Sequence, residues 1–329
     1  MDGTYSEENT GEPIVEEQGG EQLVRKKGFW AKLRTQKLLV ILSVPFVLYM
    51  LLFSYAPMIG LVMAFQDFSV ESAGSLFDAP WVGWANFVEL FQMNEFLLAF
   101  RNTVAMGVIN LIAGTVSGIL LALILNEVHN LLLKKITQTI SYLPYFLSWV
   151  IVANLVTNML SLDGIINSVL QFLHIIDEPI LFMAQPKLFW LIIALSSVWK
   201  NVGYGSIVYL AAITSIDPSL YEAASMDGAG RLRRIWNITL PCIMPTIQLL
   251  FIMNVGWVIG SGFEQQMLLR NSTTYDVSIV IDLFVLKYGT QLGRFSFATA
   301  AGLFKSVVNV LLLLIVNFIG KRMTNTTLF

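Results

Sequence analysis

The sequence predicts an all-α polytopic membrane protein with six transmembrane helices, on three observations. Hydrophobic residues make up 56% of the 329 residues and charged residues only 13%, whereas soluble domains carry about 25% charged residues. The mean hydropathy of +0.69 means more apolar surface than one water-soluble core can bury. One cysteine and two histidines supply neither a disulfide framework nor a His/Cys metal cluster. Together these features argue against a water-soluble enzyme, a disordered chain and a nucleic-acid-binding protein.

The two ends of the chain differ from the apolar middle. Residues 1–24 contain seven acidic residues and no basic one, and such a composition is typical of a disordered segment. Residues 25–37 are basic, with aromatic and leucine side chains at helical spacing, which predicts an interfacial segment on the membrane surface. Residues 38–323 are expected to form the transmembrane domain, and residues 324–329 a short C-terminal tail.

Six apolar segments are long enough to cross a hydrocarbon core of about 30 Å, which takes about 20 residues of helix. They cover residues 38–64, 101–125, 138–160, 188–213, 241–262 and 298–319. Pro45 and Pro57 predict a kinked or broken first span, and Pro144 predicts a bent entry into the third.

The basic residues indicate the orientation. With the N-terminus inside, thirteen of the twenty Lys and Arg residues lie in cytosolic segments and five in external ones. This bias favours cytoplasmic N- and C-termini in a multi-pass plasma or inner membrane protein. The external segments, about 65–98, 161–187 and 263–297, contain aromatic and apolar residues, and we expect short helices in them.

The loop between spans four and five, residues 214–241, contains a complete set of helix start and stop signals. Asp217 suits an N-cap, Pro218 the first helical position, and Gly228 a left-handed helix end. The loop therefore predicts a capped helix of about ten residues on the cytosolic face. Short helices between membrane spans are common, and the helix by itself needs no partner.

This loop also contains a longer pattern, EAA-x3-G-x9-I-x-LP. Its fixed positions are Glu222, Ala223, Ala224, Gly228, Ile238, Leu240 and Pro241. The pattern resembles the signature of permease subunits of binding-protein-dependent ABC importers, with every fixed position matched. The chain from about residue 35 onward resembles more closely the LplB-type oligosaccharide permeases of this superfamily. The segments that carry this closer resemblance are Ser141–Trp149, Val198–Lys200, Gly205–Ile207, Tyr209–Ala212 and Ala300–Phe304.

The resemblance implies a MetI-like transmembrane domain whose loop helix is a coupling helix docking in a cleft of a cytosolic ATPase. Glu222 and Asp227 would then supply charge, Ala223 and Ala224 a close approach, and Gly228 the turn. We call residues 214–241 the EAA loop.

The resemblance also implies partners: a second permease subunit that is a different chain, two copies of a cytosolic ABC ATPase, an extracytoplasmic solute-binding protein and an oligosaccharide substrate. The chain has no G-x-x-x-x-G-K-[ST] phosphate loop, so ATP and Mg are expected on the separate ATPase and no cofactor on this chain. No catalytic residue, metal ligand or nucleic acid partner is expected. The alternative is an ion-coupled secondary transporter of a small polar solute, disfavoured because the spans lack acidic residues and an obvious inverted repeat.

Two spans carry polar side chains on one helical face. They are Ser197, Lys200, Asn201 and Tyr204 in span four, and Asn254, Trp257 and Ser261 in span five. Polar groups inside a membrane usually face a protein interior or a wet cavity. Amides, hydroxyls and aromatic faces suit a sugar, and in maltose-type relatives the helices flanking the coupling loop line the sugar site. The alternative is interhelical hydrogen bonding. Lys200 could attract an acidic sugar or pair with a carboxylate of the second subunit.

Overall fold

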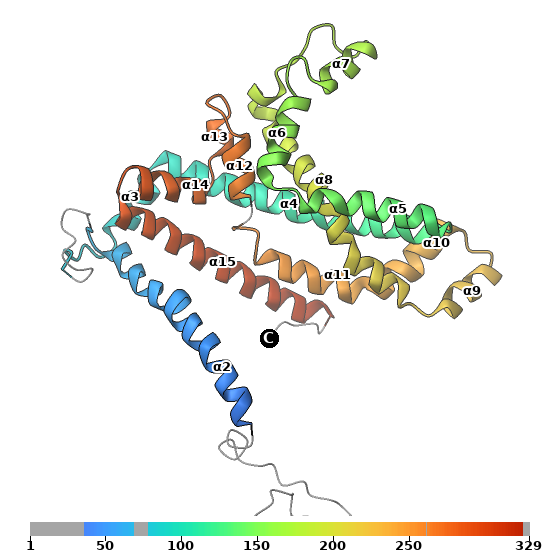
Figure 1. Cartoon of the computed structure of the whole chain (residues 1–329), viewed down its shortest axis with the longest axis horizontal. Coiled ribbons are helices and arrows are strands. Elements are labelled where there is room, and N and C mark those ends of the chain that lie inside the picture. The colour runs from blue at the N-terminus through green and yellow to red at the C-terminus, as the bar shows by residue number, and fades with distance from the viewer. Residues whose placement is uncertain (1–35, 69–77, 261, 325–329) are drawn as a thin grey trace, which may run out of the picture. The chain divides into compact units, whose positions relative to one another are not determined.

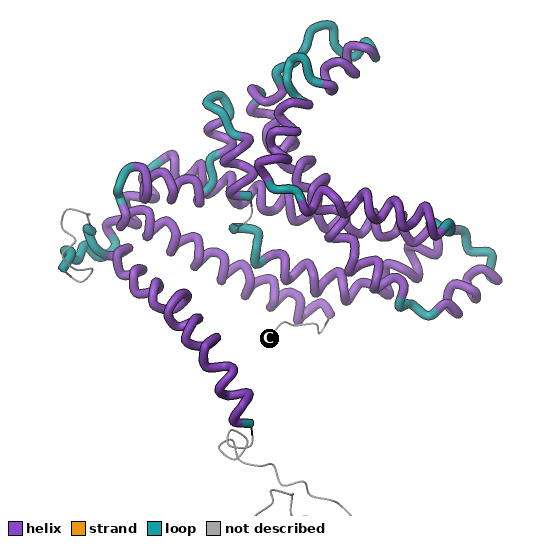
Figure 2. Tube along the Cα trace, viewed as in Figure 1, coloured by secondary structure: helices purple, strands orange, loops and turns teal. Residues whose placement is uncertain are grey.

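The computed structural model describes residues 36–68, 78–260 and 262–324. The predicted acidic tail 1–24, nearly all of the basic segment 25–37 and the end of the C-terminal tail lie outside these ranges. The chain divides into two units, residues 1–60 and 61–329, which are described separately. Helices and loops make up the described residues, and none of these forms a named strand (Figure 2). The all-α prediction is confirmed.

The first unit contains the start of the first predicted span. Helix α2 (Lys37–Met50) continues as a π-helical segment, η1 (Leu51–Tyr55), and then as a 3-10 segment, η2 (Ala56–Phe65). Pro45 lies inside α2 and Pro57 at the start of η2. A proline removes a backbone donor and clashes with the preceding turn. The expected distortion therefore takes the form of changes in helix geometry along one apolar run, Lys37–Phe65, that is long enough to cross a membrane.

The second unit contains the remaining long helices (Figure 1). They are α4 (Asn94–Glu127), α8 (Pro186–Thr214), α11 (Leu240–Val255) and α15 (Phe295–Thr324). Helix α11 is preceded by α10 (Arg231–Arg234) and a π-helical turn, η5 (Ile235–Thr239). Helices α4 and α8 form the most extensive helix pair. Four of the predicted spans correspond to these runs.

The third predicted span is bent. Helix α5 (Leu131–Tyr142) continues into a 3-10 turn, η3 (Leu143–Phe146), and α6 (Trp149–Met159) departs at 104°. Pro144 lies at the start of η3, where its fixed φ is tolerated. The described chain therefore has five helices long enough to span a membrane, or six if this bent pair is one span. The predicted bend is confirmed.

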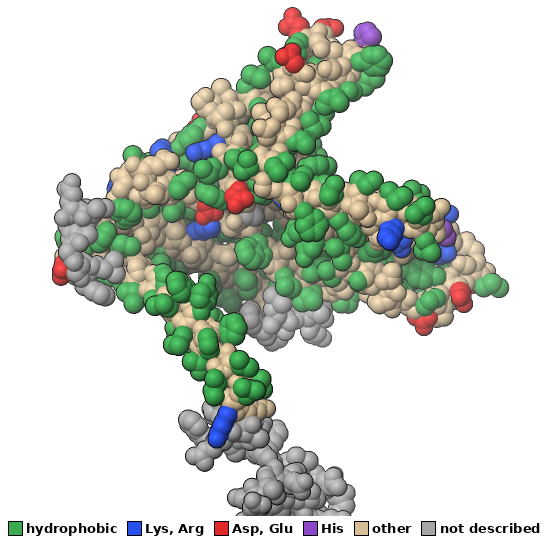
Figure 3. Space-filling model, viewed as in Figure 1, with side chains coloured by type: hydrophobic (Ala, Val, Ile, Leu, Met, Phe, Trp, Pro, Cys, Tyr) green, Lys and Arg blue, Asp and Glu red, His purple; other side chains and the backbone are tan. Residues whose placement is uncertain are grey.

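The predicted external segments contain short helices, as expected. They are α3 (Ala85–Gln92), α7 (Ile165–Phe172), η4 (Phe182–Ala184), α12 (Phe263–Leu269), α13 (Tyr275–Ser278), α14 (Ile281–Val285) and the π-helical turn η6 (Leu286–Gln291). The larger core cluster lies here, where Phe96, Phe284 and Phe297 join α4, α14 and α15. Hydrophobic side chains cover much of the visible outer face (Figure 3), as lipid contact requires.

Polar contacts fasten the segment from α12 to η6 onto the long helices. The Lys287 ammonium lies 2.7 Å from Glu95 at the start of α4, and Tyr275 and Tyr288 donate to the same carboxylate. Burial acts against the charge of Lys287, but its bonds to Glu95 and Tyr275 raise its pKa above the ordinary value. Asn102 of α4 donates to two backbone carbonyls of this segment. The segment is therefore part of the folded bundle.

Candidate functional site

The helix of the EAA loop is α9 (Pro218–Met226), and both of its predicted caps are confirmed. The Asp217 carboxylate accepts a hydrogen bond from the Ser219 N–H at 2.9 Å, which lowers the pKa of Asp217. Gly228 has φ +74°. Its N–H donates to Ser225, and the next N–H, of Ala229, donates to Ala224. This pair of bonds is the Schellman motif, and it satisfies the last carbonyls of the helix.

Helix α9 presents one face outward and one face to the bundle. Glu222, Ala223 and Asp227 are exposed, whereas Tyr221 and Ala224 are half-buried. In Figure 1, α9 lies beyond the ends of α8 and α10. Of the side chains assigned to docking, Glu222, Ala223 and Asp227 are thus accessible on a short capped helix, while Ala224 faces the bundle. Their contact with an ATPase stays a prediction.

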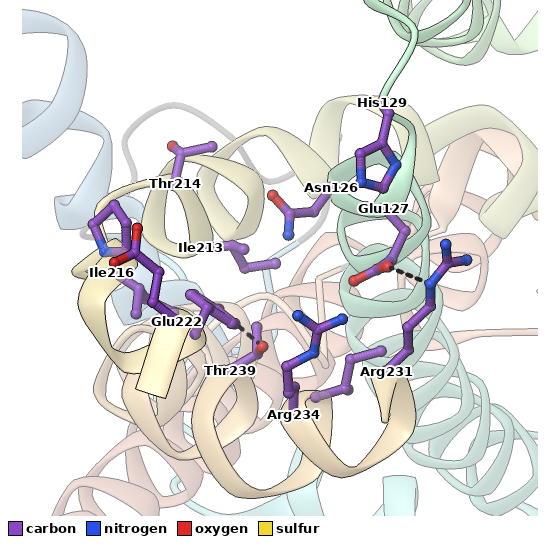
Figure 4. A pocket seen from close by; sticks show the side chains of 13 residues that line it. Asn126, Glu127, His129, Ile213, Thr214, Ile216, Glu222, Arg231, Arg234 and Thr239 are labelled. Carbon is purple, nitrogen blue, oxygen red and sulfur yellow. Dashed lines mark hydrogen bonds and ion pairs between the residues drawn. The ribbon is translucent and has the colours of Figure 1, made fainter. Parts of the chain in front are cut away.

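A cavity of about 450 Å³ lies between α9 and the bundle, and we call it the loop cavity (Figure 4). Its polar lining residues are Asn126, Glu127, His129, Thr214, Tyr221, Glu222, Arg231, Arg234 and Thr239. The Tyr221 and Thr239 hydroxyls lie 3.0 Å apart. Arg234 donates to the Ser225 hydroxyl at 3.2 Å. The first bond fastens α9 to η5, at the entrance to α11, and the second fastens it to α10. Sequence reasoning missed both bonds because they join residues nine and more positions apart.

The Tyr221–Thr239 bond gives a testable interaction energy. Thr239 is 2% exposed, so Tyr221→Phe leaves a buried hydroxyl unpaired at a cost of about 1–3 kcal/mol. The double variant Tyr221→Phe/Thr239→Val removes both partners, and we expect it to be no less stable than Tyr221→Phe alone. Thermal unfolding of the detergent-solubilised chain measures this. Additive losses in the double variant would contradict the bond.

A second cavity, of about 430 Å³, lies among α4, α8, α11 and η3, and we call it the polar cavity. Its lining includes five of the seven polar residues predicted for the substrate path: Ser197, Asn201, Tyr204, Asn254 and Trp257. Ser261 lies outside the described residues, and Lys200 is absent from the lining. The structure thus brings the two predicted stripes together, and their contact with substrate stays a prediction.

Sequence reasoning missed further polar residues of the polar cavity, and two of them matter for its chemistry. Asn110 comes from α4 and Tyr145 from η3. The Asn110 side-chain oxygen is buried without a hydrogen-bond partner among the described residues, which suits a polar ligand or water in the cavity. Asn110 could have been found by extending the rule for intramembrane polar groups to span two. Tyr145 carried no such signal, because its position depends on the bend after η3.

Lys200 lies behind the wall of the polar cavity. Its side chain is buried, 7% exposed, and its ammonium donates to the Tyr145 carbonyl at 2.7 Å. The same ammonium lies 5.4 Å from the centre of the Tyr145 ring and 5.7 Å from that of Trp149. Lys200 therefore contacts the bend after η3 from one helix of the same chain, α8.

The two cavities are joined by packed side chains. A second core cluster of α4, α8 and α11 includes Leu125, Tyr209, Ile213 and Ile243. Tyr209 also lines the polar cavity and Ile213 the loop cavity. Helices α8 and α11, which flank the EAA loop in the sequence, carry the polar stripes into the bundle.

Apolar spanning helices, a polar cavity between them and a capped EAA loop define a membrane-transport permease. The chain belongs to the family of binding-protein-dependent transport system inner membrane components, whose model matches residues 114–325. It is therefore a multi-pass membrane protein, and the predicted class of ABC importer permease with a MetI-like fold is confirmed.

Individual relatives cover almost the whole chain. The polygalacturonan/rhamnogalacturonan transport system permease protein YteP of Bacillus subtilis (strain 168) is 41% identical over 91% of this chain and 92% of its own length. Protein LplB of the same organism is 39% identical over 91% and 93%. A crystal structure of a bacterial ABC transporter involved in the import of the acidic polysaccharide alginate matches with a TM-score of 0.82, at 41% identity, over 90% of this chain and 99% of that chain. The alginate transporter in complex with an alginate pentasaccharide-bound periplasmic protein matches with a TM-score of 0.83, at 40% identity, over 91% and 99%.

Proposed function

We propose that this chain forms part of the translocation path of an ATP-driven importer of oligosaccharides released from acidic polysaccharides. The observation that carries this proposal is the polar cavity, in which hydroxyl, amide and aromatic side chains of α8 and α11 line one space inside an apolar bundle. Such groups hydrogen-bond sugar hydroxyls and stack on sugar C–H faces. The polymers named for two relatives, polygalacturonan and alginate, are both polymers of sugar acids, which supports the acidic class.

In this proposal the EAA loop transmits the motion of a cytosolic ATPase. Glu222, Ala223 and Asp227 are accessible for docking on α9, and Gly228 ends the helix in a defined turn. The bonds from Tyr221 to η5 and from Ser225 to α10 connect α9 to the helical run that leads into α11, so a displacement of α9 would be transmitted to α11. ATP and Mg belong to the ATPase, since the sequence has no phosphate loop, and this chain acts as a transport subunit and performs no catalysis.

The proposed assembly contains this chain, a second permease of different sequence, two ATPase copies and an extracytoplasmic solute-binding protein. The alginate-transporter relative solved with its periplasmic protein supports the last of these. The distribution of Lys and Arg, thirteen in the segments predicted to be cytosolic against five in those predicted to be external, supports cytoplasmic N- and C-termini.

The test is uptake by the reconstituted transporter with its binding protein and a panel of acidic and neutral oligosaccharides. We expect ATP-dependent uptake of an acidic oligosaccharide. Uptake of none of the panel, or uptake that persists without ATP under an ion gradient, would contradict the proposal.

Tyr204→Ala tests the polar cavity itself. The Tyr204 ring is half exposed and lines the cavity, so its removal should raise the half-saturation constant for oligosaccharide about tenfold, which corresponds to about 1.4 kcal/mol of lost binding. Ile207→Ala is the matched control, because Ile207 lies on the same helix and outside the cavity lining. Equal half-saturation constants in the two variants would exclude Tyr204 from the path.

A further inference from the structure

We propose that Lys200 is a positioning residue that holds Tyr145 and Tyr204 together as a rigid aromatic platform in the wall of the polar cavity. The inference rests on the proposed function only in taking this cavity as the path of the oligosaccharide. It assigns to Lys200 a role different from direct attraction of an acidic sugar.

The first step is the cost of burying the ammonium. A lysine inside a spanning helix is expensive unless its charge is compensated. Among the described residues no carboxylate forms an ion pair with Lys200, and Glu264 of α12 acts on it only from a longer distance. The ammonium is held instead by the Tyr145 carbonyl and by the faces of two aromatic rings. Both kinds of contact stabilise a cation.

The second step is the position of that carbonyl. Tyr145 lies in η3, one residue before the end of the helical run that starts at α5, and α6 leaves at 104°. Carbonyls at a helix end have no partner within the helix, and the end carries partial negative charge. Lys200 supplies both a hydrogen-bond donor and a positive charge there. It therefore fastens the backbone of the bend to α8.

The third step is what the fastening positions. The Tyr145 ring stacks on the Tyr204 ring with centroids 4.1 Å apart and planes 9° apart. Tyr204 lies four residues after Lys200 on α8, which is about one helical turn. On one turn of α8, Lys200 binds the backbone carbonyl of Tyr145, and on the next turn Tyr204 stacks on the ring of Tyr145. Both rings line the polar cavity. Because the two rings are already held in place, binding a sugar on them does not cost the entropy of ordering their side chains.

The experiment compares Lys200→Met with Lys200→Arg in the complete reconstituted transporter. Lys200→Met removes the donor and the charge, so we expect the half-saturation constant to rise about tenfold for acidic and neutral oligosaccharides alike, with a maximal rate within about twofold of wild type. Lys200→Arg keeps a cation that donates to a carbonyl and stacks on aromatic rings, and should restore most of the loss.

A double-mutant cycle separates positioning from general destabilisation. In the Tyr204→Ala background the platform is already lost, so Lys200→Met should raise the half-saturation constant no further. A purely structural lysine would instead lower the maximal rate or the assembled amount, and its effect would add to that of Tyr204→Ala.

Three results would overturn the inference: a half-saturation constant unchanged in Lys200→Met, a loss confined to acidic oligosaccharides, or additivity in the cycle. If Lys200→Met does not assemble, Tyr145→Ala replaces it, because this variant keeps Lys200 and the carbonyl that it binds. An unchanged half-saturation constant in Tyr145→Ala would then reject the platform. Failure of the proposed function can be told apart from failure of this inference, because in the first case the wild-type transporter itself would take up no oligosaccharide.

Discussion

Gly228→Pro abolishes oligosaccharide uptake while the chain still inserts into the membrane; this is the largest functional effect that we expect. Gly228 has φ +74°, whereas proline is locked near −65°. Proline also removes the N–H that donates to the Ser225 carbonyl at 3.1 Å. The Schellman end of α9 cannot form, so α9 and the chain leading to η5 lose their relative orientation. Uptake by membrane vesicles and the amount of chain in the membrane fraction measure the two parts of this result.

Gly230→Ala is the matched control. Gly230 lies two residues further on with φ −68°, and an added Cβ would meet nothing within 4 Å. We expect near-normal uptake from this variant. Glu222→Lys tests the docking face of the same helix, because it reverses an exposed charge without touching either cap. It should also abolish uptake, and co-purification with the ATPase should fall. Full uptake by Gly228→Pro or Glu222→Lys at normal expression would reject the coupling role of the EAA loop.

The EAA loop could be predicted from sequence because its structure is local. Asp217, Pro218 and Gly228 each act on backbone groups within about five residues, so their identities are enough to place both ends of α9. The bend of the third span was predicted for the same reason, from Pro144. Its angle was not, because the direction in which α6 leaves η3 depends on contacts with α8 and α12.

The polar cavity was predicted in part. Its stripes on α8 and α11 stand out because polar groups are costly in an apolar span. The helical period could not show that Lys200, on the same stripe, turns toward η3. Its partner Tyr145 lies 55 positions away, and a contact at that separation is set by packing. Tyr221 and Thr239 show the same limit over 18 positions.

The close approach of α8 to the end of α5 predicts the largest effect on stability, that of Gly203→Ala. A Cβ on Gly203 would lie 2.0 Å from the Ser141 carbonyl oxygen, a backbone atom that cannot rotate away. The two helices must separate, and overpacking of this kind costs about 1–3 kcal/mol or more. Gly205→Ala, two residues along α8, is the control for stability, because its Cβ would meet nothing within 4 Å. Both changes gain helix propensity of about 1 kcal/mol, so the control should be as stable as wild type or more stable.

We therefore expect opposite signs from two identical substitutions on one helix. Gly203→Ala should lower the midpoint of thermal unfolding in detergent by about 2–5 °C, and Gly205→Ala should leave it unchanged or raise it slightly. The same separation of helices would move η3 away from α8, so the contact between Lys200 and Tyr145 should weaken together with the stacking of Tyr145 on Tyr204. Equal midpoints for the two variants would mean that α8 does not approach α5 this closely. Gly203 lies between Lys200 and Tyr204, and the close approach at Gly203 brings both residues within reach of η3. Without that approach, the contacts of Lys200 and Tyr204 with Tyr145 could not hold the bend in place.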